Sequence, residues 1–464
     1  MVSRQRFRES RWGGPGTALV AILGGAAALR LVGLKYGLPF GLLDPDETQI
    51  VPRSWRMIHG GGADPHWFRY PSLLLYLLAP FQSWQAAPSY FPARLVVLVL
   101  GLAAVGAAWL LGRRAYGVAA GAVAAAVVAV ETTHGAYSRI AAPDVPLTLG
   151  IAVTLALLIA GRVEWAALAA GLSTAIAYPG FFLLVPLVVA VWGQWRRLAI
   201  SVAIGFAAFC VATPFVLVDL GRAAEDGWRA ARDARLGALG FEHDHTAAIA
   251  FVARLWHGMG PVLIVVVAGL VAALVRRTRA DLVLASFVLV YLADLLTLRA
   301  HFDRSVLPLV PPLAALAGRF RSIVPVTLML LVVPLVWAVR ADQKLTREDT
   351  RVVALRWIED HVPRETKLVL DTGLPQPRGF RVVRLKLPGP GRGFDKHRFL
   401  ENLRQHGTAT VVVNGSIADK VLAAHDRYRR EARFYEHLKT NALRVFYDGP
   451  NRHRWGPWVA VYRL

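Results

Sequence analysis

The sequence predicts a polytopic α-helical membrane protein that carries a small α/β domain at its C-terminus. Of its 464 residues, 55% are hydrophobic and only 18% are charged, and the mean hydropathy is +0.43. A soluble globular protein normally has about a quarter of its residues charged. The apolar residues also form runs that suit about 30 Å of hydrocarbon, and these runs end near residue 340. We therefore expect a transmembrane part over residues 1–340 and a separate domain over residues 341–464.

The net charge of +22 would suggest a nucleic-acid partner in a soluble domain. Here the basic residues lie mainly between apolar runs or in the tail, so membrane topology explains many of them, and we expect no nucleic-acid partner. The single cysteine, Cys210, excludes an internal disulfide. Arginines at positions 4, 6, 8 and 11 precede the first apolar run without a clear cleavage site, which favours a retained signal anchor.

The basic residues between the apolar runs indicate how often the chain crosses the membrane. We place the N-terminus in the cytoplasm and treat the short apolar segment Tyr70–Trp84 as a helix on the outer membrane surface. Every short arginine-bearing loop then falls inside, whereas counting Tyr70–Trp84 as a span would put all of them outside. The sequence thus predicts about eleven spans. They are Thr17–Leu38, Pro92–Leu111, Val118–Val130, Val145–Ala160, Val163–Tyr178, Phe181–Trp195, Leu198–Leu217, Phe251–Val275, Leu282–Leu298, Val306–Ala317 and Ile323–Val339.

The same topology places the polar segments of the chain together on the outer face. These are the opening loop (residues 39–91), Glu131–Asp144, Asp219–Ala250, Arg299–Arg304 and the tail. Loops longer than about 12–15 residues are usually functional or disordered, and the aromatic residues of the opening loop argue against disorder. We interpret this gathering of ionisable groups as the main sign of function.

The tail alternates between helix-like and strand-like pieces, which is typical of a small α/β domain. The expected helices are Val352–His361, Arg398–His406 and Ile417–Leu438. The expected strands are Lys367–Asp371, Thr408–Asn414 and Trp458–Tyr462. The tail also has a surplus of Lys and Arg, which fits either a solvated surface or contact with anionic head groups or an anionic acceptor.

Acidic residues crowd the start of the opening loop. Asp44, Asp46 and Glu47 fall within four positions, so mutual repulsion can raise a pKa and create a usable base. Carboxylates also mark the wet end of many helices, but the basic and aromatic residues that follow favour a functional interpretation of Asp46 and Glu47.

Two further outer segments carry candidate phosphate ligands. Arg139 and Asp144, in SRIAAPDVPL, stand at the mouth of another span, as a phosphate site or as a structural ion pair. Arg299 and Arg304 lie outside against the charge bias, and an anionic donor phosphate at the membrane face would explain them. His301, between them, is a candidate substrate-binding residue.

The opening loop also contains candidate substrate-binding residues. His66, Arg69 and Tyr70 lie in PHWFRY, just before the expected surface helix. Aromatic residues with arginine are typical of a membrane interface, so a simple membrane anchor is an alternative.

The sequence has no pattern typical of a metal or nucleotide site. The nearest metal-like motif is HDH at His243–His245, which we interpret as a solvated loop, so the sequence indicates no metal site. No phosphate-binding glycine loop or dinucleotide fingerprint is present, which argues against an ATP-driven or nucleotide-sugar enzyme. We therefore expect no cofactor.

Four motifs together resemble the membrane glycosyltransferases of the GT-C class. They are DPDETQIV, ADPHWFRYPSLLLYLL, SRIAAPDVPLTL and HFDRSVLPLVPPLAALAG. The nearest branch contains protein O-mannosyltransferases and lipid A aminoarabinose transferases. The tail pieces ALRWIEDHVPRETKLVLD and RWGPWVAVYRL are similar to the extracytoplasmic domain of bacterial members.

The resemblance implies a polyprenyl-phosphate sugar as donor and inverting transfer of the sugar on the outer face of a bacterial inner membrane. Asp46 would deprotonate the acceptor hydroxyl with support from Glu47, and Asp144 would be the acidic residue of the second outer loop. Arg139 would hold the lipid phosphate. The acceptor would be an extracytoplasmic glycan, glycolipid or protein.

One position departs from the family's pattern. Many relatives have Lys or Arg before a Tyr-Pro step at the outer end of a middle span, where this chain has Ala177. Arg299 or Arg304 would then have to contact the phosphate instead.

Two other classes of protein fit parts of the sequence. A transporter or flippase of lipid-linked intermediates would use the charged residues as a path, although transporters usually place charges near the midplane, often in repeated halves. A membrane scaffold would explain the tail but would leave the outer clusters without a purpose.

Overall fold

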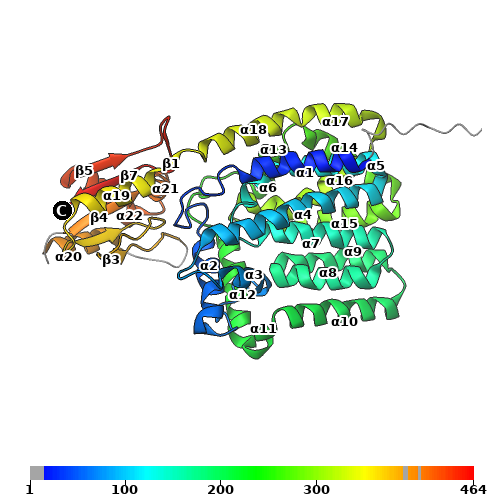
Figure 1. Ribbon diagram of the computed structural model, residues 1–464, viewed down its shortest axis with the longest axis horizontal. Helices are drawn as coiled ribbons and strands as arrows, with labels where there is room; N and C mark the ends of the chain where they lie inside the picture. Colours follow the sequence, from blue (N-terminus) through cyan, green and yellow to red (C-terminus); the bar gives the residue numbers. More distant parts are fainter. Residues whose placement is uncertain (1–14, 390–394, 406–408) are drawn as a thin grey trace, which may run out of the picture.

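The computed structural model describes residues 15–389, 395–405 and 409–464. The arginines at positions 4 to 11, the predicted helix end at His406 and the predicted strand start at Thr408 lie outside the described residues. The described chain forms a bundle of roughly parallel and antiparallel helices with an α/β domain at one end (Figure 1).

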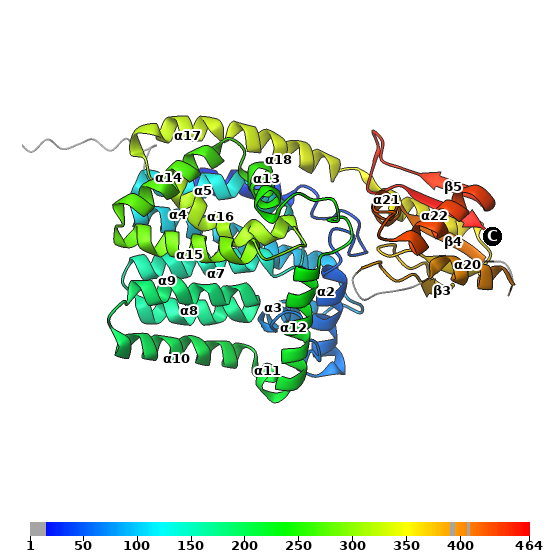
Figure 2. The ribbon, with the colours of Figure 1, turned by 180° about the vertical axis from the view of Figure 1, so that it is seen from behind.

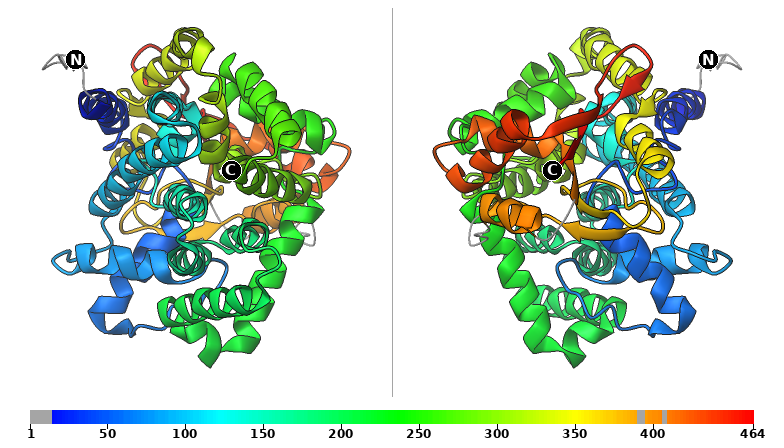
Figure 3. Two further views of the ribbon diagram at one scale, coloured as in Figure 1. Left: turned by 90° about the vertical axis from the view of Figure 1, so that its right-hand side faces the viewer. Right: turned by 90° about the vertical axis from the view of Figure 1, so that its left-hand side faces the viewer.

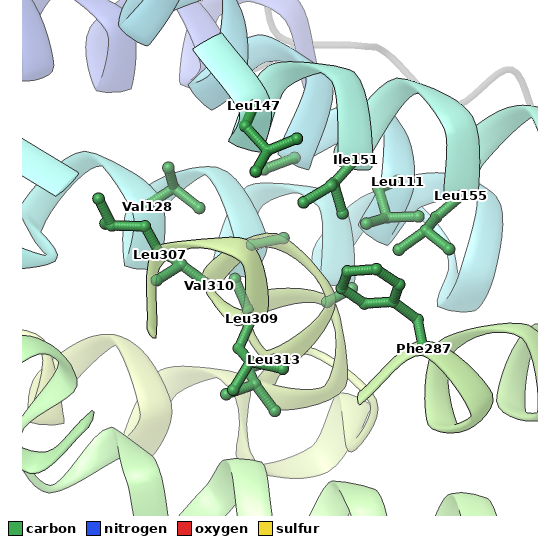
Figure 4. Close-up of a cluster of buried hydrophobic side chains, with 14 of the residues drawn as sticks. Leu111, Val128, Leu147, Ile151, Leu155, Phe287, Leu307, Leu309, Val310 and Leu313 are labelled. Carbon is green, nitrogen blue, oxygen red and sulfur yellow. The ribbon is translucent and has the colours of Figure 1, made fainter. Parts of the chain in front are cut away.

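The bundle is built from apolar helices that the sequence largely predicts. Its helices are α1 (Pro15–Leu31), α4 (Tyr90–Tyr116), α5 (Val118–Val130), α7 (Asp144–Ile159), α8 (Val163–Ile176), α9 (Leu184–Ala190), α10 (Trp195–Ala212), α13 (Ala247–Met259), α14 (Val262–Arg276), α15 (Arg279–Leu295), α16 (Val310–Ala317), α17 (Val324–Leu330) and α18 (Val332–Lys344). Figure 4 shows their common core, in which Phe287 lies near Leu111, Ile151 and Leu155.

The arginine-bearing loops lie together at the end of the bundle remote from the domain (Figure 1). Arg319 pairs with the Asp281 carboxylate, which also accepts a hydrogen bond of 2.7 Å from Tyr116. Arg279 donates to Leu158 O at 3.2 Å. These contacts connect arginine-bearing loops that the sequence assigns to the same, cytoplasmic side of the membrane.

The structure does not establish the predicted count of eleven spans. In the described part of the chain, three helices are long and apolar enough to cross a membrane, namely Tyr90–Tyr116, Trp195–Ala212 and Arg321–Lys344. The predicted span Phe251–Val275 is broken into α13 and α14, which are inclined at 117°. The break falls at Gly260 and Pro261, because proline lacks the N–H that would continue the helix.

The outer surfaces of several bundle helices are apolar. On α10, Phe206 is 64% exposed and Val211 is 81% exposed, and Met329 on α17 is 74% exposed. Contiguous apolar surface of this kind is costly in water and is normally covered by a partner or by lipid. The exposed faces of α10, α14 and α17 to α18 are therefore where we place the hydrocarbon.

Short helices cover the end of the bundle nearest the domain. They are α2 (Glu47–Arg56) with η1 (Met57–Gly61), α3 (Leu73–Leu78) with η2 (Ala79–Gln82), α6 (Thr132–Tyr137), η3 (Tyr178–Leu183), α11 (Pro214–Val218), α12 (Leu220–Leu236) and η4 (Asp303–Leu309). Figures 1 and 2 both show α2, α3 and α12 at this end. The continuous segment Leu73–Gln82 corresponds to the predicted surface helix, and its ten residues rise only about 15 Å, too little to cross a membrane.

The C-terminal domain is a mixed sheet with helices on both faces, shown in front of the bundle in the right panel of Figure 3. Its sheet order is β3-β2-β4-β7-β5, with the β2 pairs parallel and the β7 pairs antiparallel. The strands are β2 (Lys367–Leu370), β3 (Arg381–Arg384), β4 (Ala409–Asn414), β5 (Leu443–Asp448) and β7 (Val459–Arg463), and β1 (Glu348–Asp349) pairs with β6 (Arg454–Trp455). The helices are α19 (Thr350–His361), α20 (Lys396–Gln405), α21 (Gly415–Ala423) and α22 (Arg429–Asn441).

The domain matches most of the predicted elements and corrects one. The helix at Val352–His361 and the strands at Lys367–Asp371 and Trp458–Tyr462 are confirmed as α19, β2 and β7. The single helix predicted over Ile417–Leu438 is wrong, because the chain turns between α21 and α22.

Candidate active site

The candidate active site is a cluster of carboxylates around one arginine at the domain end of the bundle. Asp46 precedes α2 and its Oδ2 accepts a hydrogen bond of 2.8 Å from the Tyr70 hydroxyl. The same oxygen forms an ion pair with Arg304 of η4. Arg304 also lies 3.6 Å from Asp44 Oδ1. Residues separated by more than 250 positions thus meet at one point.

Local backbone geometry holds the two aspartates side by side. The backbone N–H of Asp46 donates to Asp44 Oδ1 at 2.8 Å, a turn typical of aspartate before a helix. Both carboxylates are mostly buried, with side-chain exposures of 14% for Asp46 and 11% for Asp44. Burial raises the pKa of Asp44 to about 6, an effect that Arg304 opposes and Asp46 reinforces.

Asp144 is the third carboxylate of the cluster. It is the first residue of α7, and its Oδ2 is buried without a hydrogen-bond partner in the described structure. It lies close enough to Arg304, Asp46 and Asp44 to interact with their charges. Three carboxylates therefore lie within electrostatic range of one guanidinium, so the cluster has an excess of negative charge when all three are ionised.

Glu47 points away from this cluster into the protein. Its carboxylate is fully buried and forms a two-point ion pair with Arg94 of α4, with N–O distances of 2.8 and 2.7 Å. It also accepts a hydrogen bond of 3.0 Å from the backbone N–H of Ala141. Arg94 in turn donates to the carbonyls of Leu34 and Tyr36. Glu47 thus fixes α2, and with it Asp46, on the bundle.

Arg139 lies in a second buried ion pair. Its Nη2 is 2.6 Å from Asp342 Oδ1 of α18, and its guanidinium also donates to the carbonyls of Val32 and Gly135. These contacts join α1, α6 and α18. A phosphate that bound Arg139 would have to displace Asp342.

The remaining predicted residues of the opening loop lie against α12. His66 is exposed and lies 3.2 Å from Asp64, and Arg69 lies 3.8 Å from Asp233 of α12. The backbone N–H of Phe68 donates to Asp226 of α12 at 2.9 Å. Phe68 and Arg69 of the PHWFRY motif are therefore attached to α12.

Two predicted residues before η4 occupy different environments. His301 is buried, 3.0 Å from Asp244 Oδ2 and 3.1 Å from the carbonyl of Leu298, which is a structural setting. Arg299 is exposed, and its backbone N–H donates to Ala234 O of α12 at 3.1 Å. Of the three basic residues in this segment, only Arg304 contacts the carboxylate cluster.

Sequence reasoning missed one neighbour of the cluster and the buried partner of Glu47. Tyr137 of α6 lies beside it, close enough to feel the charges of Asp44, Arg304 and Asp144. Arg94, the buried partner of Glu47, lies two residues into the predicted span Pro92–Leu111, and an arginine at such a position signals a buried partner.

The cluster does not have the arrangement of a metal centre. Across residues 15–389, 395–405 and 409–464, no group of three or more His, Cys, Asp or Glu side chains is placed to hold a metal ion. The arrangement can instead bind a proton on a carboxylate and neutralise an anion at Arg304.

Comparison with known proteins gives the fold. Neither a family model nor a curated protein sequence matches the chain. Among solved structures, ArnT from Cupriavidus metallidurans in the apo state matches with 17% identity and a TM-score of 0.58, over 96% of this chain and 97% of that one. ArnT from the same organism bound to undecaprenyl phosphate matches with 16% identity and a TM-score of 0.57, over the same shares of the two chains.

An archaeal structure matches equally well. The oligosaccharyltransferase AglB from Archaeoglobus fulgidus, in complex with an inhibitory peptide and a dolichol-phosphate, has 13% identity and a TM-score of 0.60, over 96% of this chain and 74% of that one. ArnT and AglB share the GT-C fold, the class that the four sequence motifs of this chain resemble. The chain therefore has the GT-C fold, a membrane-type helical bundle followed by a C-terminal domain with a sheet.

Proposed function

We propose that this protein is a membrane glycosyltransferase that moves a sugar from a polyprenyl-phosphate carrier to an extracytoplasmic acceptor hydroxyl. The observation that carries the proposal is the meeting of Asp46, Asp144, Tyr70 and Arg304 at one end of an apolar bundle. A carrier lipid cannot leave the bilayer, so the reacting groups must lie at the membrane surface. The carriers named for two structures of this fold, undecaprenyl phosphate and dolichol-phosphate, support this choice of donor.

Asp46 is the proposed general base. Its contacts with Tyr70 and Arg304 both use Oδ2, which leaves Oδ1 for an acceptor hydroxyl. Asp46 takes the hydroxyl proton while the acceptor oxygen bonds to the anomeric carbon from the face opposite the phosphate. The bond between that carbon and the phosphate oxygen breaks, and the electron pair leaves with the polyprenyl phosphate. The anomeric configuration inverts.

Arg304 is the proposed contact for the donor phosphate. Without substrate it neutralises Asp46, and an arriving phosphate competes for the guanidinium and frees Asp46 to accept a proton. Asp144 remains the second catalytic carboxylate of the proposal. The assignments of Arg139 and Arg299 to the donor phosphate stay predictions, as does a catalytic role for Glu47. Because Glu47 pairs with Arg94, we propose that it positions Asp46.

Substrate contacts are proposed for the surface beside the cluster. Tyr70 adjoins Asp46 directly, while His66 and Arg69 line the adjoining loop where an acceptor would approach. The substrate-binding role predicted for His301 stays a prediction. Its side chain is buried, so a substrate would reach it only if the residues around it moved.

The proposed topology follows the charge bias. The N-terminus and the arginine-bearing loops lie in the cytoplasm of a bacterium, the chain crosses the inner membrane about eleven times, and the C-terminal domain lies outside. The joining of the arginine-bearing loops at one end of the bundle supports this orientation.

The test is transfer by the purified protein in liposomes supplied with labelled polyprenyl-phosphate sugars. We expect release of free carrier phosphate together with a glycosylated acceptor, or slow hydrolysis when the acceptor is absent. Movement of intact lipid-linked sugar between leaflets without turnover would instead identify a flippase and refute the proposal.

A further inference from the structure

A cavity, called here the junction cavity, lies between the bundle and the C-terminal domain. It has a volume of about 590 Å³ and is lined by the end of α1 and the segment that follows it, the start of α4, the connection between α18 and α19, and α19 itself. None of Asp46, Asp144 and Arg304 lines it, so it is separate from the candidate active site. Its size falls in the usual range for small-molecule and lipid head-group sites.

The bundle side of this junction cavity is apolar. Leu31, Leu38 and Phe91 form part of the wall. Leu31 is 54% exposed and Phe91 is 37% exposed, although both belong to apolar helices of the bundle. The bundle therefore exposes apolar side chains at this side of the junction cavity.

Charged side chains line the junction cavity on both sides. Lys35 follows α1 on the bundle side, and Arg347 and Arg356 lie on the domain side with Glu348 and Asp349. Arg356 pairs with Glu348, and Asp349 pairs with Arg351 just outside the cavity.

Two cations of the junction cavity remain without a carboxylate. Lys35 Nζ lies 5.9 Å from the ring centre of Phe91, and Arg347 Nη1 donates to the carbonyl of Asn451 at 3.0 Å. In the described part of the chain, neither side chain forms an ion pair. The unpaired positive charge beside an apolar wall is complementary to an amphipathic anion.

We propose that the junction cavity binds a membrane lipid with an anionic phosphate head group, taken from the leaflet next to the C-terminal domain. Lys35 and Arg347 contact the phosphate, and an acyl chain runs along Leu31 and Phe91. Because the walls come from both the bundle and the domain, the bound lipid also holds these two parts together. The proposal is independent of the proposed transfer reaction.

The test is native mass spectrometry of the full-length, delipidated protein titrated with phosphatidylglycerol or phosphatidylcholine. We expect one saturable phosphatidylglycerol adduct that phosphatidylcholine does not match. The double variant Lys35→Gln with Arg347→Gln should weaken this binding about tenfold or more. The control, Arg430→Gln with Lys439→Gln, removes two exposed cations of α22 and should bind phosphatidylglycerol as the wild type does.

Three results would overturn the proposal. They are unchanged phosphatidylglycerol affinity in the Lys35/Arg347 double variant, equal binding of the two lipids, and complete competition by inorganic phosphate, which would indicate a soluble ligand. If the double variant does not fold, Phe91→Ala replaces it. That variant keeps both charges but removes the apolar wall, so its phosphatidylglycerol binding should weaken, and unchanged binding would refute a lipid site.

Discussion

Asp46 and Glu47 are adjacent in the sequence, yet their side chains meet different parts of the protein. Successive residues at a helix start point about 100° apart, so one carboxylate faces Arg304 and the other faces Arg94. The sequence alone groups them as one acidic pair. The structure separates the partly exposed carboxylate of Asp46 from the fully buried one of Glu47, and only Asp46 is placed to meet a substrate.

The ion pair of Glu47 and Arg94 should contribute to stability rather than to chemistry alone. Glu47→Gln would leave the Arg94 guanidinium buried without its counter-charge, at a cost of about 3–5 kcal/mol in the free energy of unfolding. Glu225→Gln, which breaks an exposed pair with Arg229, should cost less than about 1 kcal/mol. Chemical unfolding in detergent measures both, and equal losses would contradict a structural role for Glu47.

Asp44 should make stability depend on pH. Its pKa is raised to about 6 in the folded protein, from 3.8 in the unfolded chain, so the folded state binds the extra proton between these values. Protonated Asp44 therefore adds to the free energy of unfolding at low pH, and this contribution is lost as the pH rises through about 6. Asp44→Asn should remove this part of the pH dependence. Identical slopes for variant and wild type between pH 4 and 6 would contradict the assignment.

At the scale of the elements, the packing of α10 against α8 includes one very close backbone approach. A Cβ on Gly171 of α8 would lie 2.1 Å from the backbone carbonyl oxygen of Gly205, so the two helices approach as closely as glycine allows. Gly171→Ala should therefore push α10 away and cost roughly 1–3 kcal/mol. Gly106 of α4 has no atom near its added Cβ, and Gly106→Ala should be neutral or slightly stabilising. Thermal unfolding of the two variants in detergent compares them directly, and equal midpoints would contradict the packing.

Apolar runs predicted most bundle helices, but they could not show where a run bends. Phe251–Val275 was predicted as one span, but Gly260, with a positive φ, and Pro261 divide it into two helices. The opposite error concerns α12, which the sequence presented as part of a charged loop. Its helix is held by tertiary contacts such as that between Asp226 and Phe68, which spacing along the chain does not reveal.

On the scale of the whole molecule, the sequence predicted which segments meet better than which side chains touch. The motifs around Asp46, Tyr70, Asp144 and Arg304 do gather at one end. Arg139 comes from one of these motifs, yet its partner Asp342 lies 203 residues further along the chain. Such a pair is set by the packing of α18 on the bundle, so no local pattern could have identified it.

The predicted orientation can be tested with single cysteines. After Cys210→Ala, Asp360→Cys places a thiol on α19 of the domain, and Arg276→Cys places one at the opposite end of the bundle. A membrane-impermeant maleimide added to intact spheroplasts should label only Asp360→Cys, because the positive-inside bias puts the arginine-bearing loops in the cytoplasm. Labelling of Arg276→Cys alone would reverse the topology.

The central claim is that Asp46 is the base in a transfer reaction at the domain end of the bundle. The most direct measurement is the turnover of labelled polyprenyl-phosphate sugar by Asp46→Asn, beside Asp360→Asn as the same change on the exposed surface of the domain. We expect Asp46→Asn to fold normally and to lose about 10²–10⁴-fold in turnover, while Asp360→Asn keeps wild-type activity. Full activity in a correctly folded Asp46→Asn protein would contradict the claim.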